Sequence, residues 1–299
     1  MKIRVHGNKL MGNTRLNKGV KNICEDFYVF EDSKELKNIY PLLFLYIFVF
    51  NKVPEIDMNT SFKSLFYAFL LGLVISCAPR GVDYSAYIPE AEMPDVVQCI
   101  PAPPAYDSEE FAYDELRYQW GKQQRMDSAR LAQARRDAVW SLDSTIVILS
   151  EAAGMKISEK GTPCIYKVLR KGVSTIEDIR LRPKAYYFRM RPFAYYKEPS
   201  IFPEDDEWLA TEGSYPSGHT IRNWACALIM SEINPEAAEA IFERAWIAGE
   251  NRVVSGCHWQ SDVDASRPVA SIGYAKLQTS REYCRDMARA QREFRRIKR

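Results

Sequence analysis

Apolar residues recur at steps of three and four over most of the chain that follows residue 105. Between Asp127 and Ala153 one such stripe consists of Leu131, Ala134, Ala138, Leu142, Thr145 and Leu149. This spacing places side chains on one face of an α-helix, and no strand–helix rhythm or internal repeat accompanies it. The pattern predicts an all-α, single-domain helical bundle over residues 106–299.

The same reasoning predicts the other helical segments. Their expected ranges are Ser108–Lys122, Asp127–Ala153 as one long helix, Cys164–Arg170, Ile176–Met190, Thr220–Met230, Pro235–Gly249 and an amphipathic tail over Leu277–Arg299. The charged tail leaves a homo-oligomer contact open, although a solvated surface is the simpler interpretation.

Two apolar runs precede the helical region. Tyr40–Phe50 is too short to span a bilayer, which needs about 20 residues. The second run begins after Met58 with a basic residue, Lys63, followed by the apolar stretch Leu65–Ile75. A basic start before an apolar stretch of this length is typical of a secretory signal peptide.

The signal ends in Val74-Ile75-Ser76-Cys77, which resembles a bacterial lipobox. The pattern therefore predicts a signal peptide over residues 58–77, lipidation at Cys77, and an exported lipoprotein in the periplasm or anchored in the outer membrane. A buried core helix or a short signal anchor is the alternative. Residues 1–57 are interpreted as an over-extended N-terminus, and the proline-rich stretch 78–105 as an extended tether.

Charge and composition exclude several classes of protein. The chain has 41 Lys+Arg against 39 Asp+Glu, a formal charge of +2, so no nucleic-acid partner is expected. Residues 106–299 contain no apolar run of about 18 residues, so membrane contact is expected only through the lipid anchor.

Three polar clusters carry the candidate chemistry. In the first, Lys184 and Arg191 are seven residues apart, which on one helix would place both cations on nearly the same face. Two converging cations suit a phosphate group. Taken alone, a solvated charged face is the favoured explanation of this pair.

The second cluster is Ser217-Gly218-His219, where a turn leads into an apolar helix. Free backbone N–H groups at a helix N-terminus attract anions, and a glycine allows close approach. The simpler alternative is a serine-capped helix with a structural histidine.

The third cluster is Asn251-Arg252 followed by His258 and Asp262. On a helix, a carboxylate four residues after a histidine reaches its ring, fixes the tautomer and leaves the other nitrogen free as a nucleophile or base. A salt-bridged helical pair is the alternative. The chain has three histidines and no HExxH-like spacing, so no metal and no cofactor is expected.

Taken together, the three clusters resemble a known signature. Lys-x6-Arg-Pro, Pro-Ser-Gly-His and Arg-x5-His-x3-Asp, in this order, are similar to the motifs of the type 2 phosphatidic acid phosphatase superfamily. GSYPSGHT is the form found in bacterial class A non-specific acid phosphatases, and the likeness covers about residues 101–299. It implies a helical fold of the acid phosphatase/vanadium haloperoxidase type.

The resemblance also implies roles for residues. His258 would be the nucleophile that forms a phosphohistidine, Asp262 would orient it, and His219 would act as general acid and base, protonated near its ordinary pKa of about 6.5. The phosphate would be held by Lys184, Arg191, Ser217, Gly218, Arg252 and Asn251. Asn251 stands where the family usually has serine, so a tuned site is expected.

The implied activity is metal-independent hydrolysis of small phosphate monoesters. Three alternatives remain at this point: a vanadium-dependent haloperoxidase that shares the anion site, an integral lipid phosphatase, and a non-catalytic anion-binding lipoprotein. The lipid phosphatase would need membrane spans that residues 106–299 do not contain.

Overall fold

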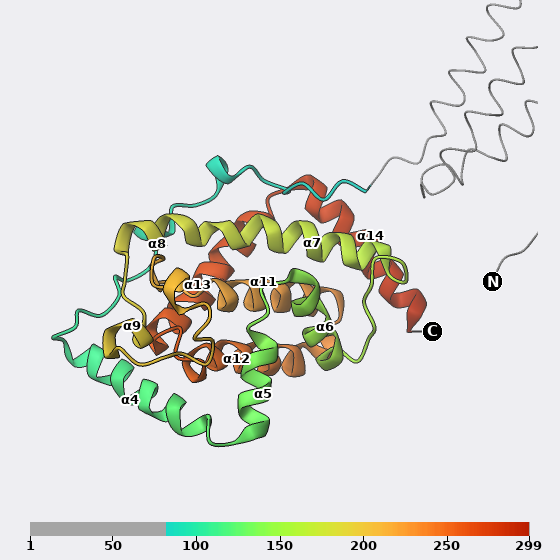
Figure 1. The fold of residues 1–299 in the computed structure, drawn as a ribbon. Helices are drawn as coiled ribbons and strands as arrows, with labels where there is room; N and C mark the ends of the chain where they lie inside the picture. Colours follow the sequence, from blue (N-terminus) through green and yellow to red (C-terminus); the bar gives the residue numbers. More distant parts are fainter. Residues whose placement is uncertain (1–81, 299) are drawn as a thin grey trace, which may run out of the picture. The chain divides into compact units, whose positions relative to one another are not determined.

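The computed structural model describes residues 82–298, which form helices joined by loops and contain no strand (Figure 1). The all-α prediction is confirmed. The helices are α4 (Glu109–Gln124), α5 (Ser128–Asp137), α6 (Leu142–Ala152), α7 (Pro163–Glu177), α8 (Leu181–Tyr187), α9 (Pro192–Tyr196), α10 (Asp206–Leu209), α11 (Gly218–Ile233), α12 (Ala238–Val254), α13 (Gln260–Leu277) and α14 (Arg281–Ile297). Short 3-10 turns are η2 (Glu90–Glu92), η3 (Val96–Gln98), η4 (Asp178–Arg180) and η5 (Pro235–Ala237).

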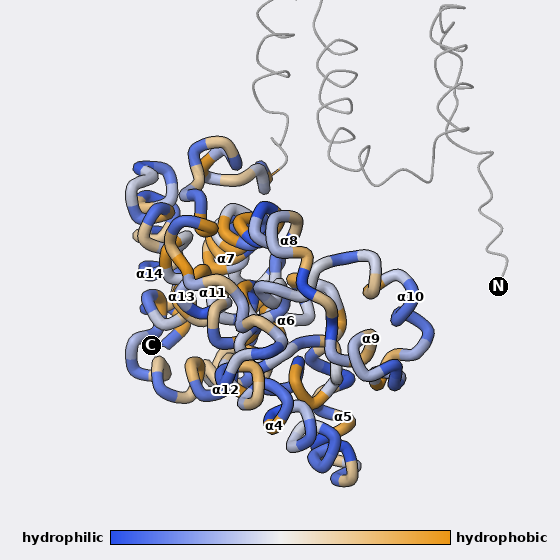
Figure 2. The backbone as a smooth tube through the Cα atoms, turned by 90° about the vertical axis from the view of Figure 1, so that its left-hand side faces the viewer, coloured by the Kyte–Doolittle hydropathy of each residue, from blue (hydrophilic) through white to orange (hydrophobic). Residues whose placement is uncertain are grey.

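Helix α11 lies at the centre of the bundle. It packs against α6, α7, α12 and α13, and residues on all its sides are buried. In Figure 2, hydrophobic colours gather where α7 and α11 meet. A helix that is apolar nearly all round belongs inside a core. Its N-terminal turn, which contains the Ser217-Gly218-His219 cluster, is therefore held by the most enclosed element of the domain.

The long helix predicted over Asp127–Ala153 is divided in two. Helix α5 ends at Asp137 and α6 begins at Leu142, with Ser141 capping α6 by accepting a hydrogen bond from the Ser144 N–H at 3.3 Å. The apolar stripe continues across the break, so periodicity alone does not reveal it. The break leaves Trp140 and the Ala138 carbonyl outside any helix.

Other expected helix ranges also differ from the structure, and none of them covered α13. Helix α7 runs through Glu177, well beyond Arg170, and the segment expected over Ile176–Met190 ends at Tyr187. Phe188 takes up a left-handed conformation with φ 41°, which terminates α8. The chain therefore changes direction between Lys184 and Arg191.

The proline-rich stretch packs onto the bundle from Tyr87 onward, so the tether interpretation is wrong for that part. Four of its side chains are buried in the main core: Tyr87, Ile88, Val96 and Ile100. The Thr175 hydroxyl accepts a hydrogen bond from the Tyr87 N–H at 2.9 Å, and the Pro101 carbonyl accepts one from the Tyr215 hydroxyl at 2.6 Å. Proline prevents a regular helix here but does not prevent apolar packing.

The compact unit containing these elements runs from Gly81 to Arg299. The expected over-extended N-terminus, signal peptide and lipidated Cys77 lie outside the described residues. Among residues 82–298, no helix combines the length and apolar character needed to cross a membrane.

Helices α4 and α12 approach closely at Gly121. A Cβ at this position would lie 2.8 Å from the Val253 carbonyl oxygen, a backbone atom that cannot rotate away. At Gly172 the nearest atom is the flexible Ile229 Cδ1, at 2.7 Å. Only glycine therefore allows α4 to lie against the end of α12 that carries Arg252.

We expect Gly121→Ala to lower the free energy of unfolding by about 1–3 kcal/mol, because the added methyl group overpacks a rigid contact. Gly172→Ala is the matched control and should lose less stability. Urea unfolding monitored by circular dichroism measures both. Equal losses in the two variants would contradict the rigid-contact explanation.

Candidate active site

A cavity of about 310 Å³ brings together most of the residues that the sequence singled out. Its walls come from the α5–α6 break, η4 and α8, the loop around α10, the first turn of α11, and the end of α12 with the loop after it. The lining residues include Ala138, Trp140, Arg180, Lys184, Arg191, Trp208, Gly218, His219, Arg252 and His258.

Lys184 and Arg191 meet in this cavity without sharing a helix. Lys184 lies on α8, whereas Arg191 lies beyond the turn at Phe188 and immediately precedes α9. The predicted convergence is present, but the helical-face explanation is wrong. The Lys184 ammonium donates to the Gly213 carbonyl at 2.6 Å, and Arg191 Nε donates to the Leu209 carbonyl at 2.8 Å.

Arg252 is the third cation of the cavity and is almost fully buried. Its Nε and one of its terminal nitrogens have no hydrogen-bond partner in the structure. Within residues 82–298, none of the three cations forms an ion pair with a carboxylate, whereas nearby Arg189, Arg222 and Arg267 all do. The cavity therefore holds positive charge that is prepared for an anionic ligand.

Burial lowers the pKa of all three cations, as desolvation of a positive charge should. It lowers the pKa of both guanidinium groups, which nonetheless stay charged because their ordinary pKa is far above neutrality. For Lys184, burial and the neighbouring charge of Arg191 lower the pKa to about 7. Lys184 is thus the cavity cation whose charge changes near neutral pH.

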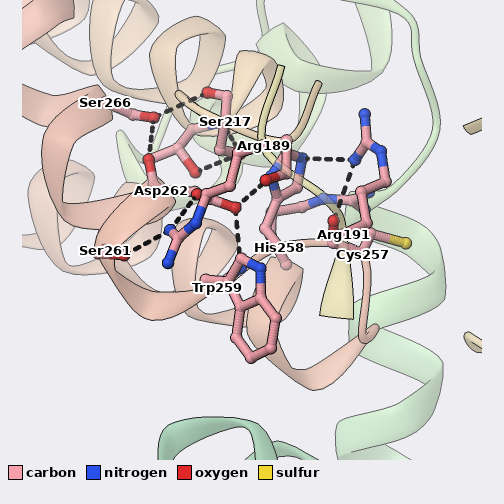
Figure 3. A network of polar contacts seen from close by, with 12 residues as sticks. Arg189, Arg191, Ser217, Cys257, His258, Trp259, Ser261, Asp262 and Ser266 are labelled. Atoms are coloured by element: carbon pink, nitrogen blue, oxygen red, sulfur yellow. Dashed lines mark hydrogen bonds and ion pairs between the residues drawn. The ribbon is translucent and has the colours of Figure 1, made fainter. Parts of the chain in front are cut away.

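His258 and Asp262 are paired through the start of a helix and not along one. His258 precedes α13, and Asp262 lies in its first turn. Asp262 Oδ2 accepts from the Trp259 N–H at 2.9 Å and from His258 Nδ1 at 3.3 Å (Figure 3). The helical salt-bridge explanation is therefore replaced by a capping carboxylate that also holds the ring.

Two contacts fix the tautomer of His258. A carboxylate only accepts hydrogen bonds, so Nδ1 carries the proton toward Asp262. A guanidinium only donates, so Nε2, which lies 3.2 Å from an Arg191 nitrogen, holds the lone pair. Burial, together with Arg191, Lys184 and Arg252, lowers the pKa of His258 well below 6.5. The ring is a neutral base with its lone pair in the cavity.

His219 projects from the first turn of α11 toward the helix break. Its Nε2 lies 2.9 Å from the Ala138 carbonyl, so that nitrogen carries a hydrogen, and its ring meets Trp140 edge-on at 4.7 Å. Burial and the charge of Arg252 lower its pKa well below 6.5. The surroundings of His219 therefore favour its neutral form.

The remaining predicted phosphate contacts divide into two groups. Gly218 lines the cavity, and a Cβ there would come within 2.8 Å of Arg180 and 3.3 Å of Trp140. Ser217 is fully buried and caps α11, its hydroxyl accepting a hydrogen bond from the Thr220 hydroxyl at 3.0 Å. Its backbone N–H donates to the Asp262 carbonyl at 3.2 Å.

Asn251 is not brought to the cavity. Its amide donates to Asp137 Oδ2 at 2.7 Å, and Asp137 also accepts two hydrogen bonds from Arg244. The position next to Arg252 in sequence is thus used to join α12 to the end of α5. Asn251 does not line the cavity, so its placement does not support the expected phosphate contact.

Sequence reasoning missed several residues of the site. Arg189 bonds Asp262 directly, and Trp140, Arg180 and Trp208 line the cavity wall. Arg189 lies within the Lys-x6-Arg-Pro stretch, and this position was the only sequence feature that could have indicated its part in the site. Within residues 82–298, no group of three or more His, Cys, Asp or Glu side chains is placed to hold a metal ion.

Comparisons with known proteins agree on one family. The PAP2 superfamily pattern matches residues 164–275. A non-specific acid phosphatase of Providencia stuartii is 37% identical over 237 residues, covering 77% of this chain and 95% of that protein. One of Salmonella typhimurium strain LT2 is 34% identical over 234 residues, covering 78% and 93%.

An acid phosphatase of Zymomonas mobilis subsp. mobilis is 35% identical over 192 residues, covering 64% of this chain and 72% of that protein. The matches include the Lys-x6-Arg-Pro, Pro-Ser-Gly-His and Arg-x5-His-x3-Asp region, which the fold gathers around one cationic cavity. By its sequence, its helical fold and its site, this chain belongs to the bacterial class A non-specific acid phosphatases of the PAP2 superfamily.

Proposed function

We propose that the cavity hydrolyses phosphate monoesters of varied structure through a phosphohistidine intermediate. One observation carries the proposal: the unprotonated Nε2 of His258 faces a cavity lined by Lys184, Arg191 and Arg252, where it accepts a hydrogen bond from Arg191. Three cations suit a phosphate dianion, and a site that only bound an anion would need no oriented nucleophile. The names of the relatives support this chemistry over the haloperoxidase and binding-lipoprotein alternatives.

In the first step, the Nε2–P bond forms while the bond between phosphorus and the leaving oxygen breaks. The leaving alcohol takes a proton from His219. Charge on the phosphoryl oxygens is stabilised by Lys184, Arg191 and Arg252, with the N-terminus of α11 at Gly218 adding backbone dipoles. These protein cations supply charge stabilisation at the phosphoryl group, so we propose a metal-independent reaction.

In the second step, water attacks phosphorus and the Nε2–P bond breaks, returning its electron pair to His258. His219 takes the proton of the attacking water and so regains the form it had before the first step. Throughout both steps Asp262 faces the cationic ring and offsets its charge.

The low pKa values of the two histidines have opposite consequences. The lowered pKa of His258 keeps it unprotonated to more acid pH than an ordinary histidine, which favours its role as a nucleophile in an acid phosphatase. His219 needs a proton that burial and the charge of Arg252 disfavour. We propose that the bound phosphate supplies it: negative charge raises the pKa of His219, and a monoester below its second pKa of about 6 brings a proton itself.

We expect His258→Ala to lower kcat for p-nitrophenyl phosphate by about 10⁴-fold or more, because no other group replaces the nucleophile. EDTA should leave the wild-type rate unchanged. Alkaline quenching during turnover of a ³²P-labelled ester should trap label on the wild-type protein and not on the variant. A fully active variant together with inhibition by EDTA would refute the mechanism.

Lys184 provides a second prediction, based on its pKa of about 7. A lowered pKa means that the ammonium loses its charge as pH rises through 7, whereas sulfate stays a dianion throughout this range. The dissociation constant of sulfate, measured by calorimetry, should therefore rise roughly tenfold between pH 6 and 8. In Lys184→Arg this rise should become smaller, since guanidinium stays charged and only the contribution of His219 remains. The same rise in both proteins would assign the titration to another group.

We also propose that the protein is exported and anchored by lipid at Cys77, in the periplasm or at the outer membrane. The support is the order of Lys63, the apolar stretch Leu65–Ile75 and the lipobox-like ending before Cys77. The catalytic unit begins at Gly81, so lipidation would take place outside the folded enzyme.

Cells expressing the full chain and fed radiolabelled palmitate should incorporate label into the wild-type protein and not into Cys77→Ser. Cys99→Ser is the matched control, since Cys99 is exposed within the folded unit. It should retain the label. Label retained in Cys77→Ser would rule out this lipidation site.

A further inference from the structure

Arg189 lies on the side of Asp262 opposite His258. Its side chain is 3% exposed, and one terminal nitrogen donates to Asp262 Oδ1 at 2.7 Å (Figure 3). The other terminal nitrogen donates to Asp114 Oδ2 at 2.7 Å. Arg189 does not line the cavity, and so is not placed to bind the substrate phosphate.

The surroundings of Arg189 hold it rigidly. Its carbonyl accepts from the Ser214 N–H at 2.8 Å, and the Ser261 hydroxyl lies 2.7 Å from the nitrogen that bonds Asp262. Asp114 projects from α4, is fully buried, and also accepts from the Ser261 N–H at 2.8 Å. Arg189 therefore links α4 to the carboxylate that orients the nucleophile.

This arrangement divides the charge of Asp262 between two cationic partners during the reaction. Oδ1 is bound by a permanent guanidinium, while Oδ2 faces the Trp259 N–H and His258 Nδ1. A carboxylate that is already neutralised by a guanidinium attracts a further proton less strongly. Asp262 can therefore orient His258 as a hydrogen-bond acceptor while it shares its charge with Arg189.

We propose that Arg189 is a positioning residue that keeps the Nδ1 proton on His258 while the phosphoryl group is attached to Nε2. The inference rests on the phosphohistidine mechanism proposed above. With Nδ1 protonated, the intermediate is a cationic phosphoimidazolium, and breaking its Nε2–P bond returns a neutral imidazole.

If Asp262 took the proton, the same step would have to release an imidazolate, a much poorer leaving group. Arg189 thus acts mainly on the second step, in which water oxygen binds phosphorus and the Nε2 electron pair is returned. The Nδ1–H bond neither forms nor breaks in either step, so the atoms and charges of the overall hydrolysis are unchanged.

The test compares Arg189→Gln, Arg189→Lys and the control Arg182→Gln in the full chain. Arg182 lies on α8, is mostly exposed and pairs with Asp95, away from the cavity. Each variant is measured for kcat, for the dissociation constant of sulfate, and for the fraction of enzyme carrying ³²P after alkaline quench during steady-state turnover of labelled phenyl phosphate.

We expect Arg189→Gln to lower kcat by about 100-fold and Arg189→Lys by about tenfold, since a lysine keeps the charge but reaches only one carboxylate. In both, the labelled fraction should rise above wild type while sulfate affinity stays within twofold. Arg182→Gln should match wild type. If Arg189→Gln fails to fold, Arg189→Lys carries the test alone.

An unchanged kcat in Arg189→Lys, or a lowered kcat without accumulation of label, would overturn the inference and leave Arg189 a purely structural role. A loss confined to sulfate affinity would overturn it as well. Failure of the underlying mechanism is recognised separately, because wild-type protein would then carry no label under any condition.

Discussion

Buried Arg191 and Arg252 and half-buried Lys184, none of which forms an ion pair with a carboxylate of residues 82–298, determine how the rest of this site is built. Burying a positive charge is unfavourable unless dipoles or an anion compensate it; carbonyl oxygens and one imidazole accept hydrogen bonds from Lys184 and Arg191. The same field lowers the pKa of both histidines. The cationic and histidine side chains are brought together by the ends of helices. Two examples are the capped N-terminus of α11 and the turn at Phe188 that ends α8.

Much of this site could be predicted from the sequence, because its chemistry is carried by ordered motifs. Lys184, Arg191, Gly218, His219, Arg252 and His258 do line one cavity, and Asp262 does hold His258. The all-α fold class follows from the hydrophobic periodicity, which does not depend on the conformation of the loops. What the motifs could not give was the local geometry: Lys184 and Arg191 converge across a turn, and His258 precedes its helix.

The misses share a physical cause, which is that they depend on contacts between distant segments. Asn251 bonds Asp137, 114 positions away, and Arg189 bonds Asp114 across 75 positions. The break after Asp137 interrupts no hydrophobic pattern, so Trp140 could not be recognised as part of the cavity wall. The proline content of residues 78–105 correctly predicted that they form no long helix. The burial of Tyr87 and Val96 could not be predicted, because they pack against the core of the helical bundle, which forms only when the chain folds.

The unpaired charge of Arg252 also affects what happens after the chemistry is finished. Inorganic phosphate, the product, carries the same groups that the cavity is prepared to hold, and its departure leaves Arg252 buried and without a partner again. Product release therefore works against the preorganisation that favours the transition state. Free phosphate is therefore expected to compete with the substrate for the cations of the cavity.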